Sequence, residues 1–163
     1  MVRYIRWTNQ TKASYGSITG FVLEQRLLWS PLSPLNSDSS PEFACSSSTP
    51  FAAAADYKIL LNDWPYGITP NITHLIVWSK IRLLDQKPEG YLTHSSTALV
   101  QDFVQRTFID RLAAKGVKNT YDKILWFRNW TGLQSVRGLE HVHILVRDVP
   151  KDVLSEWINA QGS

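Results

Sequence analysis

The sequence predicts a single α+β domain, covering residues 1–163, in which helices flank an antiparallel sheet. Four apolar stretches have the length and composition of strands, and they come in two pairs with a helix between the pairs. Helical patterns precede the first pair and follow the second, an order typical of α+β domains. The chain is 44% hydrophobic and 19% charged, which suits a globular core and excludes a disordered chain.

The N-terminal part predicts one helix and then a long flexible loop. Over residues 11–29, Tyr15, Ile18, Val22 and Trp29 keep helical spacing. Residues 30–50 contain four prolines and a dense run of serines, so neither a helix nor a strand is expected there.

The four strands are bounded by turn-forming residues such as those of "DWPYGITPN". The second strand has a near-continuous apolar core, which predicts burial on both of its faces. The strands are expected at residues 56–63, 73–83, 122–129 and 139–148.

Two further helices complete the predicted domain. Residues 92–116 have the clearest helical pattern, with Leu99, Phe103 and Leu112 on one side and Gly116 at the C-terminal stop. Pro150 stands where a last helix is expected to begin, because proline suits the first turn.

Composition also predicts the compartment and the class of partner. No apolar span of 18 residues exists and the first residues lack a secretory apolar segment, so a cytoplasmic protein without a membrane partner is expected. The single cysteine, Cys45, cannot form an internal disulfide, which fits a reducing compartment. The net charge of +3 and a sequence pI near 9.1 are compatible with a nucleic-acid partner.

Polar side chains that suit chemistry gather at the strand ends and in the turn before the fourth strand. His141 and His143 are two residues apart, so on a strand they share a face. Two imidazoles in an apolar strand lose solvation unless a metal, a substrate or a hydrogen-bond partner uses them. The other members are Asn62, Asp63, His74, Asn129, Gln134, Ser135, Arg137 and Glu140.

Histidine side chains on one strand can also hold a metal ion. His141 and His143 could share a zinc ion with His74 or His94, but no H-E-x-x-H pattern or cysteine cluster supports this site. A phosphate-binding P-loop, a dinucleotide fingerprint and a G-x-S-x-G elbow are also missing. We therefore expect neither a metal nor a cofactor.

Residues 6–29, 50–80, 103–112 and 126–148 resemble a fungal family of arginine-containing cyclodipeptide synthases, related to N-acetylglucosamine-induced proteins. The blocks "NDWPYG" and "LQSVRGLEHVH" are the most specific part of the resemblance. It implies an enzyme that takes Arg-tRNA and a second aminoacyl-tRNA and joins the two aminoacyl groups into a cyclo(Arg-Xaa) diketopiperazine, without ATP.

A weaker resemblance links residues 59–80 and 129–146 to histidine-triad (HIT) proteins, and it implies a HIT-like fold. It would make Asp63 an acceptor for a ribose hydroxyl and would place His143 at the nucleophile position. Asn129, Gln134 and Ser135 would lie near the ester or phosphate. Three residues are inserted before the histidines, and Leu145 replaces the third histidine of the triad.

These resemblances assign expected roles. His143 is the expected base or nucleophile with His141 as its neighbour, and Ser135 is the competing nucleophile. Two hydrogen-bonded core histidines are the structural alternative. The functional alternatives are a HIT-type nucleotide hydrolase and a non-catalytic nucleotide- or RNA-binding module.

Substrate and tRNA contacts are also expected. Glu140, Asp63 and Glu24 are the candidate carboxylates for the arginine side chain, although Glu140 faces away from His141 on a regular strand unless a bulge near Gly138 re-aims it. Further expected substrate contacts are His74, Trp64 and Arg137. For tRNA phosphates the expected contacts are Lys80, Arg82, Arg106, Arg111 and Lys115, with an ordinary solvated helix face as the alternative.

Overall fold

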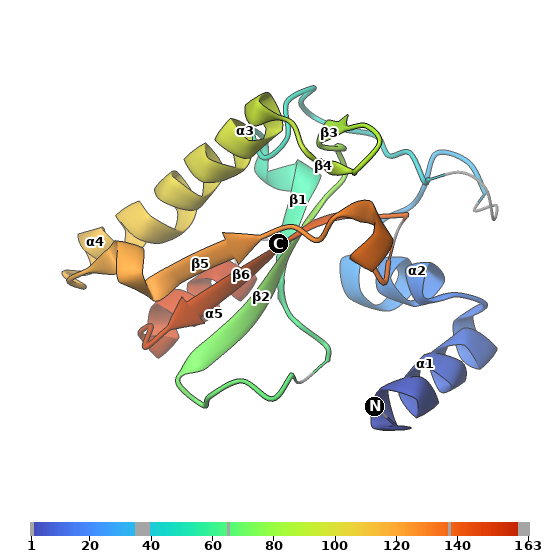
Figure 1. Cartoon of the computed structure of the whole chain (residues 1–163), viewed down its shortest axis with the longest axis horizontal. Coiled ribbons are helices and arrows are strands. Elements are labelled where there is room, and N and C mark those ends of the chain that lie inside the picture. Colours follow the sequence, from blue (N-terminus) through green and yellow to red (C-terminus); the bar gives the residue numbers. More distant parts are fainter. Residues whose placement is uncertain (1, 35–39, 65, 137, 160–163) are drawn as a thin grey trace.

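The structure, a computed structural model, describes residues 2–34, 40–64, 66–136 and 138–159, and it confirms the α+β class. Four antiparallel strands form the main sheet in the order β1-β2-β6-β5 (Figure 1). A short hairpin of β3 (Asp85–Gln86) and β4 (Tyr91–Leu92), which the sequence patterns did not predict, lies beside it. The main strands are β1 (Tyr57–Leu61), β2 (Ile72–Ser79), β5 (Ile124–Phe127) and β6 (Glu140–Arg147).

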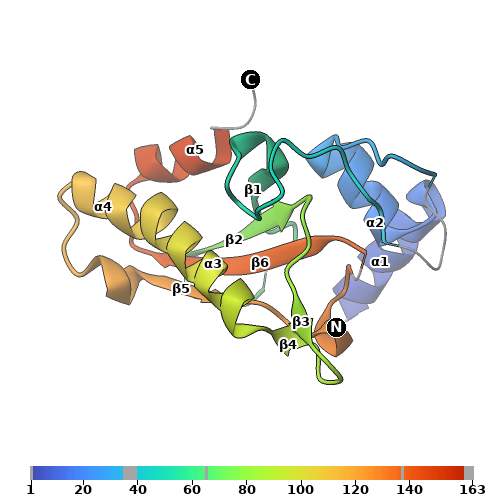
Figure 2. The same cartoon turned by 90° about the horizontal axis from the view of Figure 1, so that it is seen from above.

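One face of the sheet carries the larger hydrophobic core. The predicted helix over 92–116 is confirmed as α3 (His94–Val104), a π-helical stretch (Gln105–Ile109) and α4 (Asp110–Ala114), and α5 (Lys151–Asn159) follows Pro150 as expected. Figure 2 shows α3 and α4 crossing the sheet, with α5 beside them. The buried strand residues of this core include Leu75, Val77, Val142, Ile144 and Val146.

The N-terminal helices pack on the other face, at one end of the sheet. The prediction of one helix over 11–29 was wrong. Helix α1 (Val2–Tyr15) ends before Gly16, whose positive φ of 72° breaks the helix, and α2 (Ile18–Phe21) then runs into a π-helix (Val22–Leu27). Their apolar side chains cover Ile76 and Trp78 of β2.

The serine- and proline-rich loop has no helix or strand in its described parts, residues 30–34 and 40–50, as predicted. Its second part is nevertheless anchored to the domain. The fully buried carboxylate of Asp56 accepts hydrogen bonds from the backbone N–H groups of Ser46 and Ser47 at 2.8–2.9 Å. These hydrogen bonds involve the charged carboxylate and are therefore strong, which explains how a fully buried aspartate is tolerated there.

The register of the sheet decides which side chains reach the N-terminal helices. In β2 and β6, Ile76 pairs with His143 and Trp78 with His141, so both histidines lie on the face that these helices partly cover. Leu75 to Ser79 are buried throughout, which confirms the prediction that this strand is covered on both faces. Within the described residues, no helix has the length and apolar composition needed to cross a bilayer.

Candidate functional site

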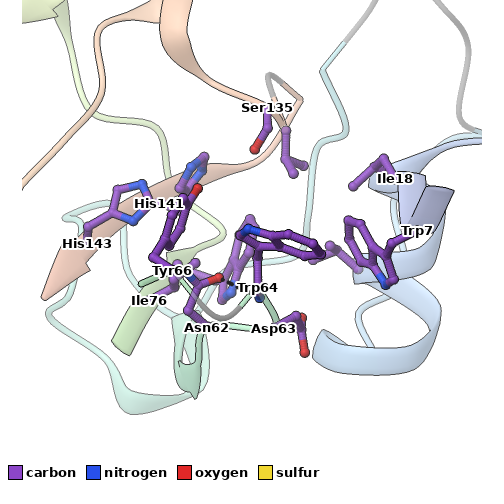
Figure 3. A pocket seen from close by; sticks show the side chains of 13 residues that line it. Trp7, Ile18, Asn62, Asp63, Trp64, Tyr66, Ile76, Ser135, His141 and His143 are labelled. Atoms are coloured by element: carbon purple, nitrogen blue, oxygen red, sulfur yellow. Dashed lines mark hydrogen bonds between the residues drawn. The ribbon is translucent and has the colours of Figure 1, made fainter. Parts of the chain in front are cut away.

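His141 and His143 line a narrow pocket between the sheet and the N-terminal helices (Figure 3). The pocket has a cavity volume of about 60 Å³. Its lining also includes Trp7 of α1, Asn62 and Asp63 after β1, Trp64 and Tyr66 in the following turn, and Ser135.

A second pocket of about 380 Å³ adjoins the first. Its lining is mainly aromatic and apolar and includes Tyr66, Phe127, Asn129 and Leu145. His143 and Tyr66 line both pockets. His143 therefore lies between two cavities, and the wider cavity falls within the usual volume range of small-molecule sites.

A chain of hydrogen bonds leads from the end of β1 to His143. Asn62 Nδ2 donates to His74 Nδ1 at 3.1 Å, and His74 Nε2 lies 3.0 Å from His143 Nδ1. The remaining ring nitrogen of His143, Nε2, is buried and has no hydrogen-bond partner among the described residues. A buried polar atom without a partner is rare in folded proteins and is often functional.

Burial keeps all three imidazoles of this region neutral. Loss of solvation, with smaller effects from His141 and His74, lowers the pKa of His143 to about 3. Loss of solvation likewise lowers the pKa of His141 and of His74. A neutral imidazole has one N–H donor and one lone pair, which suits proton transfer.

Aromatic rings hold the two strand histidines in place. The ring of Phe127 stacks on His143 with centroids 4.7 Å apart and planes 8° apart. Trp78 lies 4.8 Å from the ring of His141, and the two imidazoles meet edge to face at 5.3 Å. Such packing fixes the planes of the two imidazole rings.

Among the described residues that line the narrow pocket, Asp63 is the one carboxylate. It forms an ion pair with Arg26, with Arg26 Nε 2.9 Å from Asp63 Oδ1, and both side chains are about one-third exposed (32% and 34%). Trp64 lines the same pocket, with its ring 6.2 Å from the ring of Trp7. A carboxylate beside tryptophan rings is a suitable surface for a guanidinium group.

Glu140 lies on the opposite face of the sheet from the histidines, in an ion pair with Arg128. Arg128 Nε donates to Glu140 Oε1 at 2.7 Å, and the backbone N–H of Leu83 donates to Oε2. The register of β6 is regular from Glu140 onward, so no bulge turns this carboxylate toward His141. The structure therefore gives Glu140 a structural partner instead of access to the pocket.

The other predicted contact residues are distributed between the site and its surroundings. Ser135 lines the narrow pocket, but no hydrogen bond joins it to His143 in the part of the chain that the structure describes. Asn129 lines the wider pocket, whereas the buried Gln134 donates to the backbone carbonyl of Asn129. Glu24 lines a separate cavity with Trp29 and Pro31, and Arg137 lies outside the described residues.

The predicted tRNA contacts do not surround the histidines. Arg106, Arg111 and Lys115 belong to the helices on the opposite face and pair with Asp102, Glu156 and Asp152 respectively. Lys80 and Arg82 follow β2 and hold the loop: Lys80 lies 5.6 Å from the ring of Trp29, and Arg82 donates to Ser40 and to the carbonyl of Gly138.

The hydrogen-bond pattern also bears on the metal alternative. His74 Nε2 and His143 Nδ1 are engaged with each other, and His143 Nε2 is the ring nitrogen of this pair that has no partner among the described residues. Among the residues with described positions, no three histidine, cysteine or carboxylate side chains are placed to hold a metal ion.

The sequence patterns did not identify Trp7, Tyr66 and Phe127 as residues that line the pockets, and they did not indicate the hydrogen bond from Asn62 to His74. Phe127 alternates with Trp126 on β5, so a face assignment for this strand would have placed it beside the histidines. Trp7 carried no usable signal, because the helix that presents it was not predicted.

Comparisons with known proteins agree with one another. Residues 1–147 match the family described as "Protein of unknown function (DUF3605)". The chain is 30% identical over 166 residues to N-acetylglucosamine-induced protein 1 of Candida albicans, covering 97% of this chain and 63% of that protein. It is 28% identical over 107 residues to the uncharacterized protein YPL067C of Saccharomyces cerevisiae, covering 65% of this chain and 51% of that protein.

The chain therefore spans about half to two-thirds of the length of these curated relatives. A solved structure titled "Crystal Structure of HTC1" is similar in fold, with a TM-score of 0.61 and 25% identity over 98% of this chain and 80% of that one. With nine-tenths of its length matched, this chain belongs to the DUF3605 family.

Proposed function

We propose that this protein transfers aminoacyl groups from two aminoacyl-tRNAs to form an arginine-containing cyclic dipeptide. The observation that carries the proposal is the position of His143, a buried neutral imidazole shared by two adjoining pockets. A reaction between two large substrates needs two binding sites that meet at the reacting group. The resemblance to arginine-containing cyclodipeptide synthases supplies the substrate class.

The wider pocket suits the terminal adenosine of a tRNA. Tyr66 and Phe127 offer aromatic surface on which a base can stack, and their exposed fractions are 54% and 37%. Asn129 supplies polar groups in the same pocket. An adenosine bound there presents its ribose ester toward His143.

The narrow pocket suits the side chain of the arginyl group. Asp63 can accept two hydrogen bonds from a guanidinium, and Trp64 and Trp7 offer ring faces. The pocket is small in the free protein, so the N-terminal helices that wall it must move aside for the arginine to enter. In the free protein the Asp63 carboxylate is paired with Arg26. The guanidinium of the substrate replaces Arg26 in this ion pair.

The chemistry needs a proton acceptor and a donor for the oxyanion. The α-amine of one aminoacyl group attacks the ester carbonyl of the other and releases one tRNA. The amine of the resulting dipeptidyl ester attacks the second ester carbonyl, which closes the ring and releases the second tRNA. ATP is consumed only by the synthetases that make the esters, and the substrates place the reaction in the cytoplasm.

Leu145 argues against a HIT-type nucleotide hydrolase. It lines the wider pocket at the position of the third histidine in HIT proteins. A phosphoryl group bound there would meet a hydrocarbon side chain in place of an imidazole. Replacing the imidazole by a leucine side chain weakens the binding of a neutral ester less than the binding of a charged phosphate.

Reconstitution tests the proposal. Purified protein is mixed with tRNA, arginine, a second amino acid, both cognate synthetases and ATP, and the product is analysed by mass spectrometry. We expect a cyclo(Arg-Xaa) that disappears when RNase is added first. Product that persists after complete RNA digestion would rule out the tRNA-dependent route, and binding of tRNA without product would favour the RNA-binding alternative.

A further inference from the structure

We propose that His141 and His143 hold their protons on opposite ring nitrogens, so that His141 is the base of the reaction and His143 is the hydrogen-bond donor. Asn62 and His74 are positioning residues that fix this arrangement. The proton positions follow from the hydrogen bonds of three buried, neutral rings, whereas the two catalytic roles rest on the proposed acyl transfer. The inference changes the role expected for His143 from base to donor.

The orientation of Asn62 determines the first proton position. The backbone N–H of Trp64 donates to Asn62 Oδ1 at 3.3 Å, so the amide NH₂ group is the end that faces His74. An amide NH₂ can only donate, and His74 Nδ1 must therefore accept. Because burial keeps His74 neutral, its proton lies on Nε2.

The same logic passes from His74 to His143. His74 Nε2–H donates across 3.0 Å to His143 Nδ1, which must offer its lone pair. His143 is also neutral, so its own proton lies on Nε2, the buried nitrogen that has no partner among the described residues. His143 thus keeps a buried N–H group that no described side chain or carbonyl engages, at the junction of the two pockets and ready to donate to an oxygen atom.

His141 has the opposite arrangement. Its Nδ1 lies 2.9 Å from the backbone carbonyl of Leu139, and a carbonyl oxygen can only accept. The proton of the neutral His141 ring is therefore on Nδ1, and Nε2 keeps its lone pair. A base and a donor are thereby placed on neighbouring imidazoles whose centroids lie 5.3 Å apart.

This pair can serve each acyl transfer in full. The amine nitrogen forms a bond to the ester carbonyl carbon, and His141 Nε2 accepts the proton that the amine loses. The carbonyl oxygen becomes an oxyanion and accepts a hydrogen bond from His143 Nε2–H. When the bond from carbon to the ribose oxygen breaks, the proton on His141 passes to that oxygen, and both imidazoles return to their initial states.

The proton positions can be measured by ¹⁵N NMR of the histidine rings in the protein without substrate. We expect Nε2–H in His74 and His143 and Nδ1–H in His141. His74→Gln retains an amide donor toward His143 Nδ1, so His143 should keep Nε2–H, whereas His74→Leu should let its proton distribute over both nitrogens. A proton on Nδ1 of His143 in the unmodified protein would overturn the inference, whatever reaction the protein catalyses.

The catalytic roles are separated by glutamine substitutions, because glutamine can donate a hydrogen bond but cannot accept a proton at neutral pH. His143→Gln should keep the rate of cyclic dipeptide formation within about 10-fold, while His143→Leu should lose about 10²–10³-fold. His141→Gln should lose about 10²–10⁴-fold. An equal loss in His143→Gln and His143→Leu, with His141→Gln active, would assign the base to His143 instead.

Discussion

Arg128 and Glu140 form an almost fully buried ion pair that joins β6 to the segment after β5, and their side chains are only 2% and 1% exposed. Arg128 also lies 2.9 Å from Asp85 Oδ1 at the start of the β3–β4 hairpin. The network explains how a glutamate next to His141 is accommodated without entering the pocket.

We predict that Glu140→Gln destabilises the fold instead of changing the product. It leaves a buried guanidinium with the partly exposed Asp85 as its remaining charged partner among the described residues, which should lower the free energy of unfolding by about 3 kcal/mol. Glu156→Gln is the matched control, because it removes the exposed partner of Arg111 and should have a far smaller effect. Urea unfolding measures both. The prediction would be contradicted if the Glu140→Gln variant had normal stability and no longer selected arginine. Glu140 would then be a residue that binds the arginine side chain.

Acid should weaken the fold through its neutral histidines. An unfolded histidine titrates near pH 6.5, whereas the pKa of His143 is about 3, so in between the unfolded chain binds a proton that the native chain does not. The contribution of neutral His143 to the free energy of unfolding is therefore fully present above the pKa of an unfolded histidine, and it decreases as the pH falls below that pKa. From about pH 7.5 to about pH 5, His143 alone should lower the free energy of unfolding by about 2 kcal/mol.

Urea titrations at the two pH values give this difference directly. His143→Gln should show a smaller loss in acid, because glutamine does not titrate. His94→Gln, at the exposed start of α3, is the matched control and should behave like the unmodified protein. Equal acid sensitivity in all three proteins would contradict neutral burial of His143.

For the proposed tRNA substrate, we predict a binding contact on α1. This helix carries Arg3, Arg6 and Lys12 without an acidic residue, and its Trp7 reaches the narrow pocket. Neutralising the exposed Arg6 and Lys12 with glutamine should weaken tRNA binding and reduce its salt dependence by roughly one unit of slope per lost phosphate contact.

Arg111→Gln with Lys115→Gln is the control of equal charge, on the opposite face of the sheet. Filter binding over a range of salt concentrations compares the two pairs. If only the Arg111→Gln and Lys115→Gln variant lost tRNA affinity, the tRNA would bind to the helices that carry these two residues, as the sequence suggested.

Asp63 is predicted to select arginine. Asp63→Asn removes the charge that a guanidinium needs, so the KM for Arg-tRNA should rise by about 10-fold or more, corresponding to about 1.5 kcal/mol or more for a charged hydrogen bond. Arg26→Gln removes the competing guanidinium and should lower this KM. Glu24→Gln, in a separate cavity, should leave it unchanged. If Glu24→Gln alone raised the KM, the arginine would bind in that cavity.

Apolar runs bounded by turn residues were sufficient to predict the main sheet, because β2 and β6 are buried on both faces and end at clear turns. The i, i+2 spacing likewise placed His141 and His143 on one face. The N-terminal helices were misjudged because their boundary depends on the single positive φ of Gly16, while the pattern of apolar residues continues through it.

Roles that depend on pairing between distant segments were beyond the sequence. Asn62 and His74 are adjacent only because of the β1–β2 register, and Glu140 was a candidate for the substrate until the structure showed Arg128 beside it. The nucleic-acid surface predicted for the basic residues between 106 and 115 stays a prediction, and the sequence did not indicate that α5 supplies carboxylates to two of them. Local patterns carry no information on such partners.

The most direct test uses purified Arg-tRNA labelled in the arginyl group and a second purified aminoacyl-tRNA, with no synthetase and no ATP present. We predict that the label leaves the tRNA and appears in a cyclic dipeptide without a free amino group, and that His141→Gln suppresses this transfer. Label that stays on the tRNA, or that is released only as free arginine at the rate seen without protein, would contradict the proposed function.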